Sequence, residues 1–298
     1  MKAAAGFTLV ELMVALLLGS IIIAGALSLF NSVRAAYTSA QLMASLQERG
    51  AFALTALEDD LRLAGFWGLH SDAGLINIPS GIRVHCAGRN ISAWALQLAD
   101  PVDATDNGAL LPCPPADRFV PGTDTLIVRH ASAETADDPD RIRLHTSETT
   151  GNIFRAGAPP DISGANTFEL QISAWHLDAA SSESGLPALR RFTLTNNGLM
   201  QNQEIMPGVE DFQVLLGIDR DGDLQIDSFV NGDDRDGAPV LAVSIWLLIR
   251  SERSEPGHHD NGPWYSIDTD ARNPLRPDDS YRRASFMRTV YLRNRPPA

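Results

Sequence analysis

Residues 1–30 decide the fold, and they read MKAAAGFTLVELMVALLLGSIIIAGALSLF. A short basic head ends at Gly6, and the apolar run from Phe7 to Phe30 that follows contains a single charged residue, Glu11. A run of this length crosses a hydrocarbon layer of about 30 Å as a helix. An ordinary secretory signal is cut after its apolar region. A cut after Gly6 would instead leave the apolar helix on the mature chain.

The carboxylate of Glu11 is out of place in this apolar run. A charged residue inside a membrane segment costs a few kcal/mol on insertion scales. We therefore expect that Glu11 has a function. A buried carboxylate is tolerated mainly when it is paired. A cut after Gly6 would supply a partner, because it creates a cationic amine on Phe7, one helical turn before Glu11. The alternative is an ordinary membrane anchor with a stray acid.

The residues around the cut, Gly6-Phe7-Thr8-Leu9 and then Glu11, resemble the class III signal of type IV prepilins and pseudopilins. The resemblance implies that a prepilin peptidase cleaves between Gly6 and Phe7 and that the new Phe7 amine is methylated. It also implies that Glu11 meets the Phe7 amine of a neighbouring subunit during assembly.

The first helix is expected to continue beyond the membrane, because no proline occurs between Phe7 and Ile78. We predict one helix from about Phe7 to Ala64, roughly 85–90 Å long at 1.5 Å per residue, with Gly65 as its stop signal. Gly50 is expected to weaken it locally. Apolar residues beyond Asn31 recur at helical spacing: Leu42, Leu46, Ala53, Leu57, Leu61 and Ala64.

The chain therefore divides into a leader (1–6), a membrane and polymerisation half of the helix (7–30), an amphipathic half (31–64) and a β-rich periplasmic head domain (65–298). The expected fold class is α+β, and the resemblance implies a type IV pilin-like arrangement with the long helix packed on an antiparallel sheet. Val240–Arg250 is the most apolar candidate strand and is expected to be central and to lie against the helix. Asp100–Gly122 and Glu252–Ser280 are expected to be loops with weak strand content. The candidate strands are Ile82–Cys86, Thr125–His130, Arg141–His145, Phe168–Leu177, Leu189–Thr195, Val209–Ile218, Val240–Arg250 and Phe286–Leu292.

Short blocks after the helix resemble the PilW family of minor pilins. They are Asp60–Phe66, Pro121–Asp124, Leu189–Arg191, Pro207–Phe212, Gly217–Asp219, Leu247–Ser251 and Arg282–Asn294. These blocks favour a type IV pilus component over a pseudopilin of type II secretion. The resemblance implies a complex of minor pilins that primes pilus polymerisation or caps its tip.

Charge and cysteine content limit the partners and the compartment. The net charge of −13 argues against nucleic acid, whose binding needs clustered Lys and Arg. Two cysteines in an exported domain are first interpreted as a disulfide, Cys86–Cys113, worth on the order of 3–4 kcal/mol if unstrained. The alternative is two free thiols.

The acidic stretch Asp219–Asp227 is the best candidate for an ion site. Asp219, Asp221, Asp223 and Asp227 match positions one, three, five and nine of a calcium-binding loop, in which carboxylates at alternating positions converge on a hard cation. The sixth position is Leu224 instead of Gly, and the twelfth is Val230 instead of Glu. The alternative is a solvated acidic turn.

The sequence predicts a structural protein and not an enzyme, because no nucleophile elbow, phosphate-binding loop or Cys-x-x-Cys is present. The expected protein is an inner-membrane minor pilin that is later part of the pilus. Its expected partners are other minor pilins, the major pilin, the prepilin peptidase and inner-membrane lipid, with calcium as the one candidate cofactor. Two alternatives remain: a type II secretion pseudopilin, and a tip adhesin or calcium-dependent binding module.

Overall fold

The structure is a computed structural model that describes residues 8–108, 111–113, 118–136, 138–182, 185–264, 267 and 275–294. The chain divides into two compact units, Met1–Ser45 and Leu46–Ala298, and the second is called the head unit below. A single helix, α1 (Leu9–Leu63), runs through both. The expected helix is therefore confirmed, although Phe7 lies outside the described residues.

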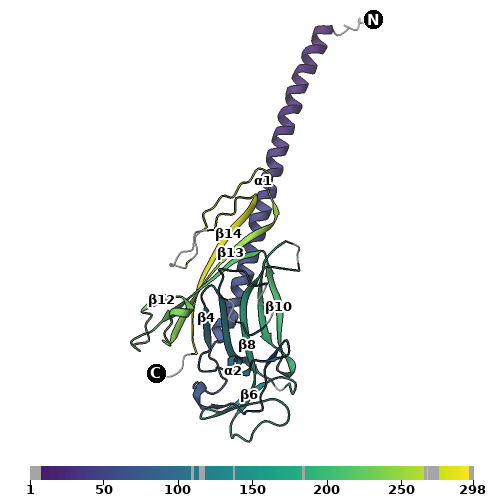
Figure 1. The fold of residues 1–298 in the computed structure, drawn as a ribbon. Coiled ribbons are helices and arrows are strands. Elements are labelled where there is room, and N and C mark those ends of the chain that lie inside the picture. Colours follow the sequence, from purple (N-terminus) through teal and green to yellow (C-terminus); the bar gives the residue numbers. More distant parts are fainter. Residues whose placement is uncertain are drawn as a thin grey trace. The chain divides into compact units, whose positions relative to one another are not determined.

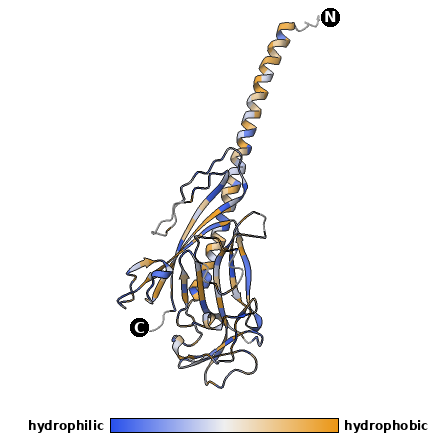
Figure 2. Cartoon of the chain, in the orientation of Figure 1, coloured by the Kyte–Doolittle hydropathy of each residue, from blue (hydrophilic) through white to orange (hydrophobic). Residues whose placement is uncertain are grey.

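The first unit contains the apolar run of α1 and continues to Ser45. The large apolar side chains of this run are exposed. Leu9, Ile22 and Phe30, for example, are 76%, 71% and 63% exposed. In Figure 2 the N-terminal part of α1 is mostly orange, the colour of hydrophobic residues, with white and blue stretches between. Among the described residues, α1 is the one helix that is long and apolar enough to cross a membrane. The exposed apolar surface is what a lipid-facing helix requires.

The remainder of α1 belongs to the head unit and buries one face, as the amphipathic pattern predicts. Backbone hydrogen bonds of the last turn, such as Phe66 N–H to the Leu63 carbonyl at 2.8 Å, end the helix. Gly65 follows in the left-handed conformation, with φ of +74°, as a C-terminal stop signal does. The buried helix residues are Leu46, Gly50, Ala53, Leu54, Leu57 and Leu61.

The larger sheet has eight strands in the order β1-β7-β6-β8-β5-β4, and β9 pairs with β8 while β10 pairs with β9. All these pairs are antiparallel except β1 with β7. Strand β8 is the centre of the sheet, since β5 lies along one edge and β6 and β9 share the other (Figure 1). The strands are β1 (Ile76–Asn77), β4 (Val102–Thr105), β5 (Thr125–Thr135), β6 (Arg143–Thr146), β7 (Gly151–Phe154), β8 (Asn166–Asp178), β9 (Ala188–Leu194) and β10 (Met200–Pro207).

The smaller sheet has the order β12-β11-β13-β14, with β12 (Ser228–Val230), β11 (Val209–Ile218), β13 (Val240–Ser254) and β14 (Tyr281–Tyr291). The apolar strand expected to be central is β13, which pairs with β11 on one side and β14 on the other. A hairpin of β2 (His85–Cys86) and β3 (Arg89–Asn90) and the short helix α2 (Ser92–Ala95) pack with residues of the larger sheet, whose core includes Cys86 and Ala95. Single-turn helices are η1 (Ala73–Leu75), η3 (Asn196–Gly198) and η4 (Gly232–Asp234).

Several strand expectations need correction. Ile82–Cys86 is not a full strand, because only His85 and Cys86 pair with β3. The short strand β4 lies inside Asp100–Gly122, where weak strand content was expected, and β10 was not expected at all. Both lie at sheet edges, where backbone pairing with one neighbour suffices and an apolar alternation is not required.

The two sheets join at Asp124. Its backbone N–H donates to the Phe212 carbonyl at 2.9 Å, and its carboxylate accepts from the Val214 N–H at 2.7 Å and the Asn107 N–H at 2.9 Å. Asp124 is 2% exposed. One buried side chain therefore connects the start of β5 to β11.

Asp60 attaches α1 to the larger sheet. The Trp175 indole of β8 donates to its carboxylate at 2.8 Å, and His130 Nε2 and Arg191 Nη1 lie 3.6 and 3.8 Å from it. Burial raises the pKa of Asp60, but His130, Arg191 and a hydrogen bond from Ser173 outweigh burial, so the pKa lies below its usual value.

The expected disulfide is present and joins Cys86 to Cys113. The buried guanidinium of Arg129, on β5, donates to three carbonyls inside the loop that the disulfide closes, those of Trp94, Ala95 and Asp100 at 2.9, 3.1 and 2.7 Å. Burial lowers the pKa of Arg129 to about 10. These bonds fix the chain after α2.

Gly50 is not simply a weak point of the helix, because a Cβ at this position would overlap the Phe286 ring of β14. We predict that Gly50→Ala destabilises the head unit by about 1–3 kcal/mol, the usual cost of overpacking, although alanine is the better helix former. Urea unfolding followed by tryptophan fluorescence measures this. All five tryptophans lie in the head unit, at positions 67, 94, 175, 246 and 264.

Two controls accompany Gly50→Ala. Adding Phe286→Leu is expected to restore part of the lost stability, because the smaller side chain leaves room for the new methyl group. Thr55→Ala on the exposed face of the same helix should change little. An increase of stability in Gly50→Ala would contradict the packing argument.

Candidate assembly site and acidic loop

The candidate assembly site is the start of α1. Gly6 and Phe7, the expected cleavage and methylation residues, lie outside the described residues, and Thr8 and Glu11 are described. The Glu11 Oε2 atom accepts the Thr8 backbone N–H at 2.9 Å and the Thr8 hydroxyl at 3.0 Å. The Glu11 N–H donates back to Thr8 Oγ1 at 3.3 Å. This reciprocal pair is a capping box, with Thr8 as N-cap and Glu11 as the third helical residue.

The capping box gives Glu11 a second role besides the expected ion pair. A carboxylate in the first turn is favoured by the partial positive charge of a helix N-terminus. Both bonds from Thr8 end on Oε2, so Oε1 has no hydrogen-bond partner among the described residues. The site can therefore satisfy its own helix and still accept a cation. The Thr-x-x-Glu spacing was visible in the sequence, but the sequence reasoning did not use it.

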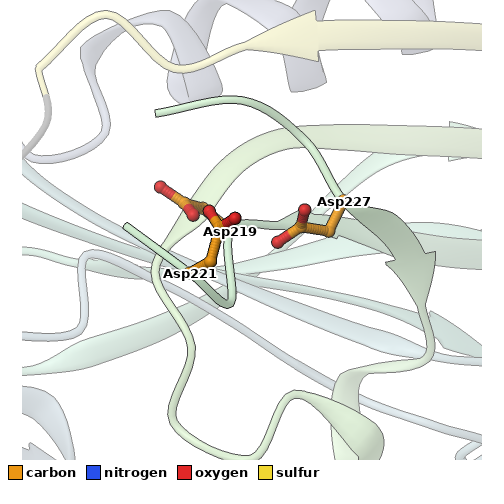
Figure 3. A group of neighbouring side chains, drawn as sticks. All are labelled: Asp219, Asp221 and Asp227. Atoms are coloured by element: carbon orange, nitrogen blue, oxygen red, sulfur yellow. The ribbon is translucent and has the colours of Figure 1, made fainter. Parts of the chain in front are cut away.

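The acidic loop joins β11 to β12, and the structure brings three of its four expected ligands together. Carboxylate oxygens of Asp219, Asp221 and Asp227 lie within 4.8 Å of one another, with Asp227 on the opposite arm of the loop (Figure 3). Asp223 is not a member of this group. Its carboxylate accepts the backbone N–H and the side-chain amide of Gln225 at 2.8 and 2.7 Å.

Asp219 organises the loop. Its carboxylate accepts the backbone N–H groups of Gly222 at 2.7 Å and Leu224 at 2.9 Å, and the residue is 1% exposed. Burial raises the pKa of Asp219, but these hydrogen bonds outweigh burial and keep the pKa below its usual value. The carboxylate is therefore charged at neutral pH.

The donor set suits a hard cation. Calcium takes six to eight oxygen ligands, of which carboxylates, carbonyls and waters are the usual sources. Leu224 adopts a left-handed conformation with φ of +66°, so the turn is formed although glycine is missing from the sixth position. Val230 pairs with Leu216 in the sheet, and it supplies no carboxylate at the twelfth position. Any further ligands must therefore be backbone oxygens, waters or other carboxylates.

A cluster that sequence reasoning missed surrounds Arg283 of β14, whose side chain is 2% exposed. The guanidinium donates to Glu210 at 2.6 Å, Asp260 at 3.1 Å and Asp279 at 2.8 Å. Glu210 also pairs with Arg250 at 3.2 Å. Burial lowers the pKa of the guanidinium, but the carboxylates outweigh it and raise that pKa above its usual value. Arg283 therefore links both β11 and the segment between β13 and β14 to strand β14.

Two family models match the chain. Residues 1–27 match the prokaryotic N-terminal methylation motif, and residues 178–294 match the family of type IV pilus-assembly protein W. The second region runs from the end of β8 through the smaller sheet and includes the acidic loop and Arg283. No curated protein matched the chain.

Among solved structures, the chain is similar to a type IV-like pilin from Thermus thermophilus. The two share 14% sequence identity over 86% of this chain and 98% of the other, with a TM-score of 0.37. The methylation motif accounts for the first turn of α1, and the PilW region accounts for the second half of the head unit. The chain is thus similar to the family of type IV pilus-assembly protein W over residues 178–294, and it joins this region to a prepilin-type methylation motif, an N-terminal apolar helix and a β-rich head.

Proposed function

We propose that this chain is a minor pilin that helps to prime type IV pilus assembly, in a priming or tip complex with other minor pilins. The observation that carries the proposal is that one chain joins a methylation motif at residues 1–27 to a PilW region at 178–294. The mechanism is association without catalysis. Membrane helices pack together, and the head units select their neighbours.

Cleavage after Gly6 is the step that prepares the chain for assembly. It frees the Phe7 amine, which is then methylated and meets Glu11 of a neighbouring subunit. The capping box supports this role, since Thr8 occupies Oε2 and leaves Oε1 for the incoming amine. In an apolar environment such a pair is far stronger than in water.

Co-isolation of the full chain from membranes tests the proposal. A tagged chain expressed with the pilus genes is expected to bring down other minor pilins in stoichiometric amounts. The pseudopilin alternative predicts that the chain co-isolates with type II secretion subunits and that piliation is normal without it. The adhesin alternative predicts that pili assemble normally without it while binding of the cells to surfaces is lost.

A second candidate function is calcium binding, which the convergence of Asp219, Asp221 and Asp227 favours. Sites of extracellular modules bind calcium with dissociation constants of about 10⁻⁴–10⁻³ M. We predict binding in this range by titration calorimetry of the full chain in detergent, with a rise in the unfolding temperature.

Three variants distinguish a specific calcium site from non-specific attraction of calcium by the negative charge of the loop. Asp221→Asn and Asp227→Asn should each weaken calcium binding about tenfold or more, because each removes a charged ligand. Asp223→Asn changes the net charge equally but lies outside the group of three, so it should bind nearly as the parent does. Absence of both heat and a thermal shift at millimolar calcium would rule the site out.

A further inference from the structure

A groove of about 460 Å³ opens beside the acidic loop of the head unit. Its lining is mainly apolar and includes Pro101, Val102, Val240, Leu241 and Leu292. Leu224 of the acidic loop also lines it, together with the charged Asp100, Asp219 and Arg235. The groove therefore combines an apolar floor with charged groups, as the core and rim of a protein interface do.

The wall at residues 99–102 is fixed in place. Arg235 donates to Asp100 Oδ1 at 2.8 Å, to the Val102 carbonyl at 3.2 Å and to the Ala238 carbonyl at 2.7 Å. Arg129 holds the Asp100 carbonyl from the other direction at 2.7 Å. The groove is thus formed before any partner binds. Binding therefore loses little conformational entropy on this side of the interface.

Leu224, one of the residues that line this groove, has an unusual backbone conformation. Its φ of +66° is a left-handed conformation, which costs a residue with a Cβ about 1–2 kcal/mol relative to the right-handed one. Its side chain is nevertheless 54% exposed. Neither backbone preference nor core packing explains a leucine at this position. Contact with a partner does explain it, since strained residues are retained mainly where they have a function.

The surroundings of the groove are acidic. Residues 219–236 contain seven aspartates and two arginines. Both arginines have carboxylate neighbours, Arg235 with Asp100 at 2.8 Å and Arg220 with Asp236 at 3.6 Å. The remaining negative charge next to an apolar groove attracts a partner that is itself apolar and positively charged.

We propose that this groove docks an apolar polypeptide segment flanked by arginine or lysine, which belongs to a neighbouring subunit of the pilus. The apolar side chains of the segment fill the space between Val102, Leu224 and Val240. Its basic residues face Asp221 and Asp227 at the rim. The identity of the partner as a pilus subunit rests on the proposed function.

Site-specific photocrosslinking in membranes tests this docking surface. The photoreactive residue p-benzoylphenylalanine replaces Leu224 in the full chain, which is expressed with the pilus genes, and isolated membranes are irradiated in the presence of EGTA. The same residue at Leu75, which is 55% exposed elsewhere on the head unit, is the surface control. The same residue at Val14 in the membrane segment reports on helix contacts. Mass spectrometry identifies the crosslinked peptide.

The expected result is an adduct from position 224, and not from 75, with a pilus subunit through a peptide that carries Arg or Lys beside apolar residues. Asp221→Asn with Asp227→Asn should lower its yield about fivefold, because two carboxylates that would pair with the basic residues of the segment lose their charge. Added calcium should lower it too, because the cation competes for the same carboxylates.

Three results would overturn the docking proposal. These are no adduct from position 224, an adduct through an acidic or lipid partner, and a yield that does not fall in the double variant. A pilin adduct from position 14 in the same experiment would show that the proposed function stands although the groove is not its docking surface. Absence of pilus adducts from both 14 and 224 would reject both proposals.

Discussion

Replacing Glu11 with alanine is expected to leave the cut after Gly6 intact and to lower incorporation into pili about a hundredfold. The estimate follows from the few kcal/mol that an unpaired charge costs in an apolar segment, at 1.4 kcal/mol per factor of ten. In the variant, the methylated Phe7 amine of each subunit enters the helix bundle without its carboxylate. Mass spectrometry of the mature N-terminus measures cleavage, and immunoblotting of sheared pili measures incorporation.

Two further variants separate ion pairing from helix capping. Glu11→Gln keeps an oxygen for the Thr8 N–H and hydroxyl but loses the charge, so it should assemble almost as poorly as Glu11→Ala. Thr8→Val removes the hydroxyl and keeps the carboxylate, so it should lose only about 1 kcal/mol of capping. Near-normal incorporation of Glu11→Gln would contradict the pairing role and would leave capping as the function of this side chain.

The sequence was most informative where its signal was local. The proline-free run and the apolar spacing predicted α1 almost to its ends, and Gly65 ends the helix in the conformation that a stop signal requires. Val209–Ile218 was predicted with the bounds that β11 has. These segments bury a continuous stripe or a whole strand, so a short window of sequence contains the pattern.

Contacts between residues far apart in the sequence could not be predicted in this way. The Met200–Pro207 strand is polar, and it exists because β9 offers it a pairing edge. Gly50 was interpreted as a weak point of the helix, whereas its partner Phe286 lies far along the chain. The carboxylates around Arg283 come from β11 and from the segment between β13 and β14, so the cluster joins parts of the chain that lie far apart in the sequence. Spacing within one segment cannot indicate such convergence.

The acidic loop shows the same limit within a single segment. The alternating aspartates suggested four ligands, and three of them converge. Asp223 points its carboxylate to Gln225 because an Asp side chain readily accepts the backbone N–H two residues on. The sequence therefore indicated the composition of the loop, while the hydrogen bonds of each turn decide which carboxylates meet.

Replacing Arg283 with methionine is expected to destabilise the head unit by about 3–5 kcal/mol, the usual cost of removing one partner from a buried ionic cluster. The variant leaves Glu210, Asp260 and Asp279 without their shared guanidinium, and Arg250 reaches only the first of them in the described structure. The segment between β13 and β14 should detach first, because it loses the contacts of Asp260 and Asp279 with the buried Arg283 and keeps only more exposed ones such as Glu255 with Arg282. Urea unfolding measures the stability, and limited proteolysis between Glu255 and Ser280 measures the detachment.

Arg282→Met is the matched control, because Arg282 pairs with Glu255 at a more exposed position and should contribute about 1 kcal/mol or less.

The pH dependence of stability provides a separate test. The hydrogen bond from Arg283 lowers the pKa of Asp279 to about 2, from an ordinary value of 3.8. Asp279 therefore stabilises the parent above about pH 4, and this contribution is lost as the pH falls toward 2. Arg283→Met should show a smaller loss in that window, and an unchanged pH profile would contradict the assignment of Arg283 as the partner of Asp279.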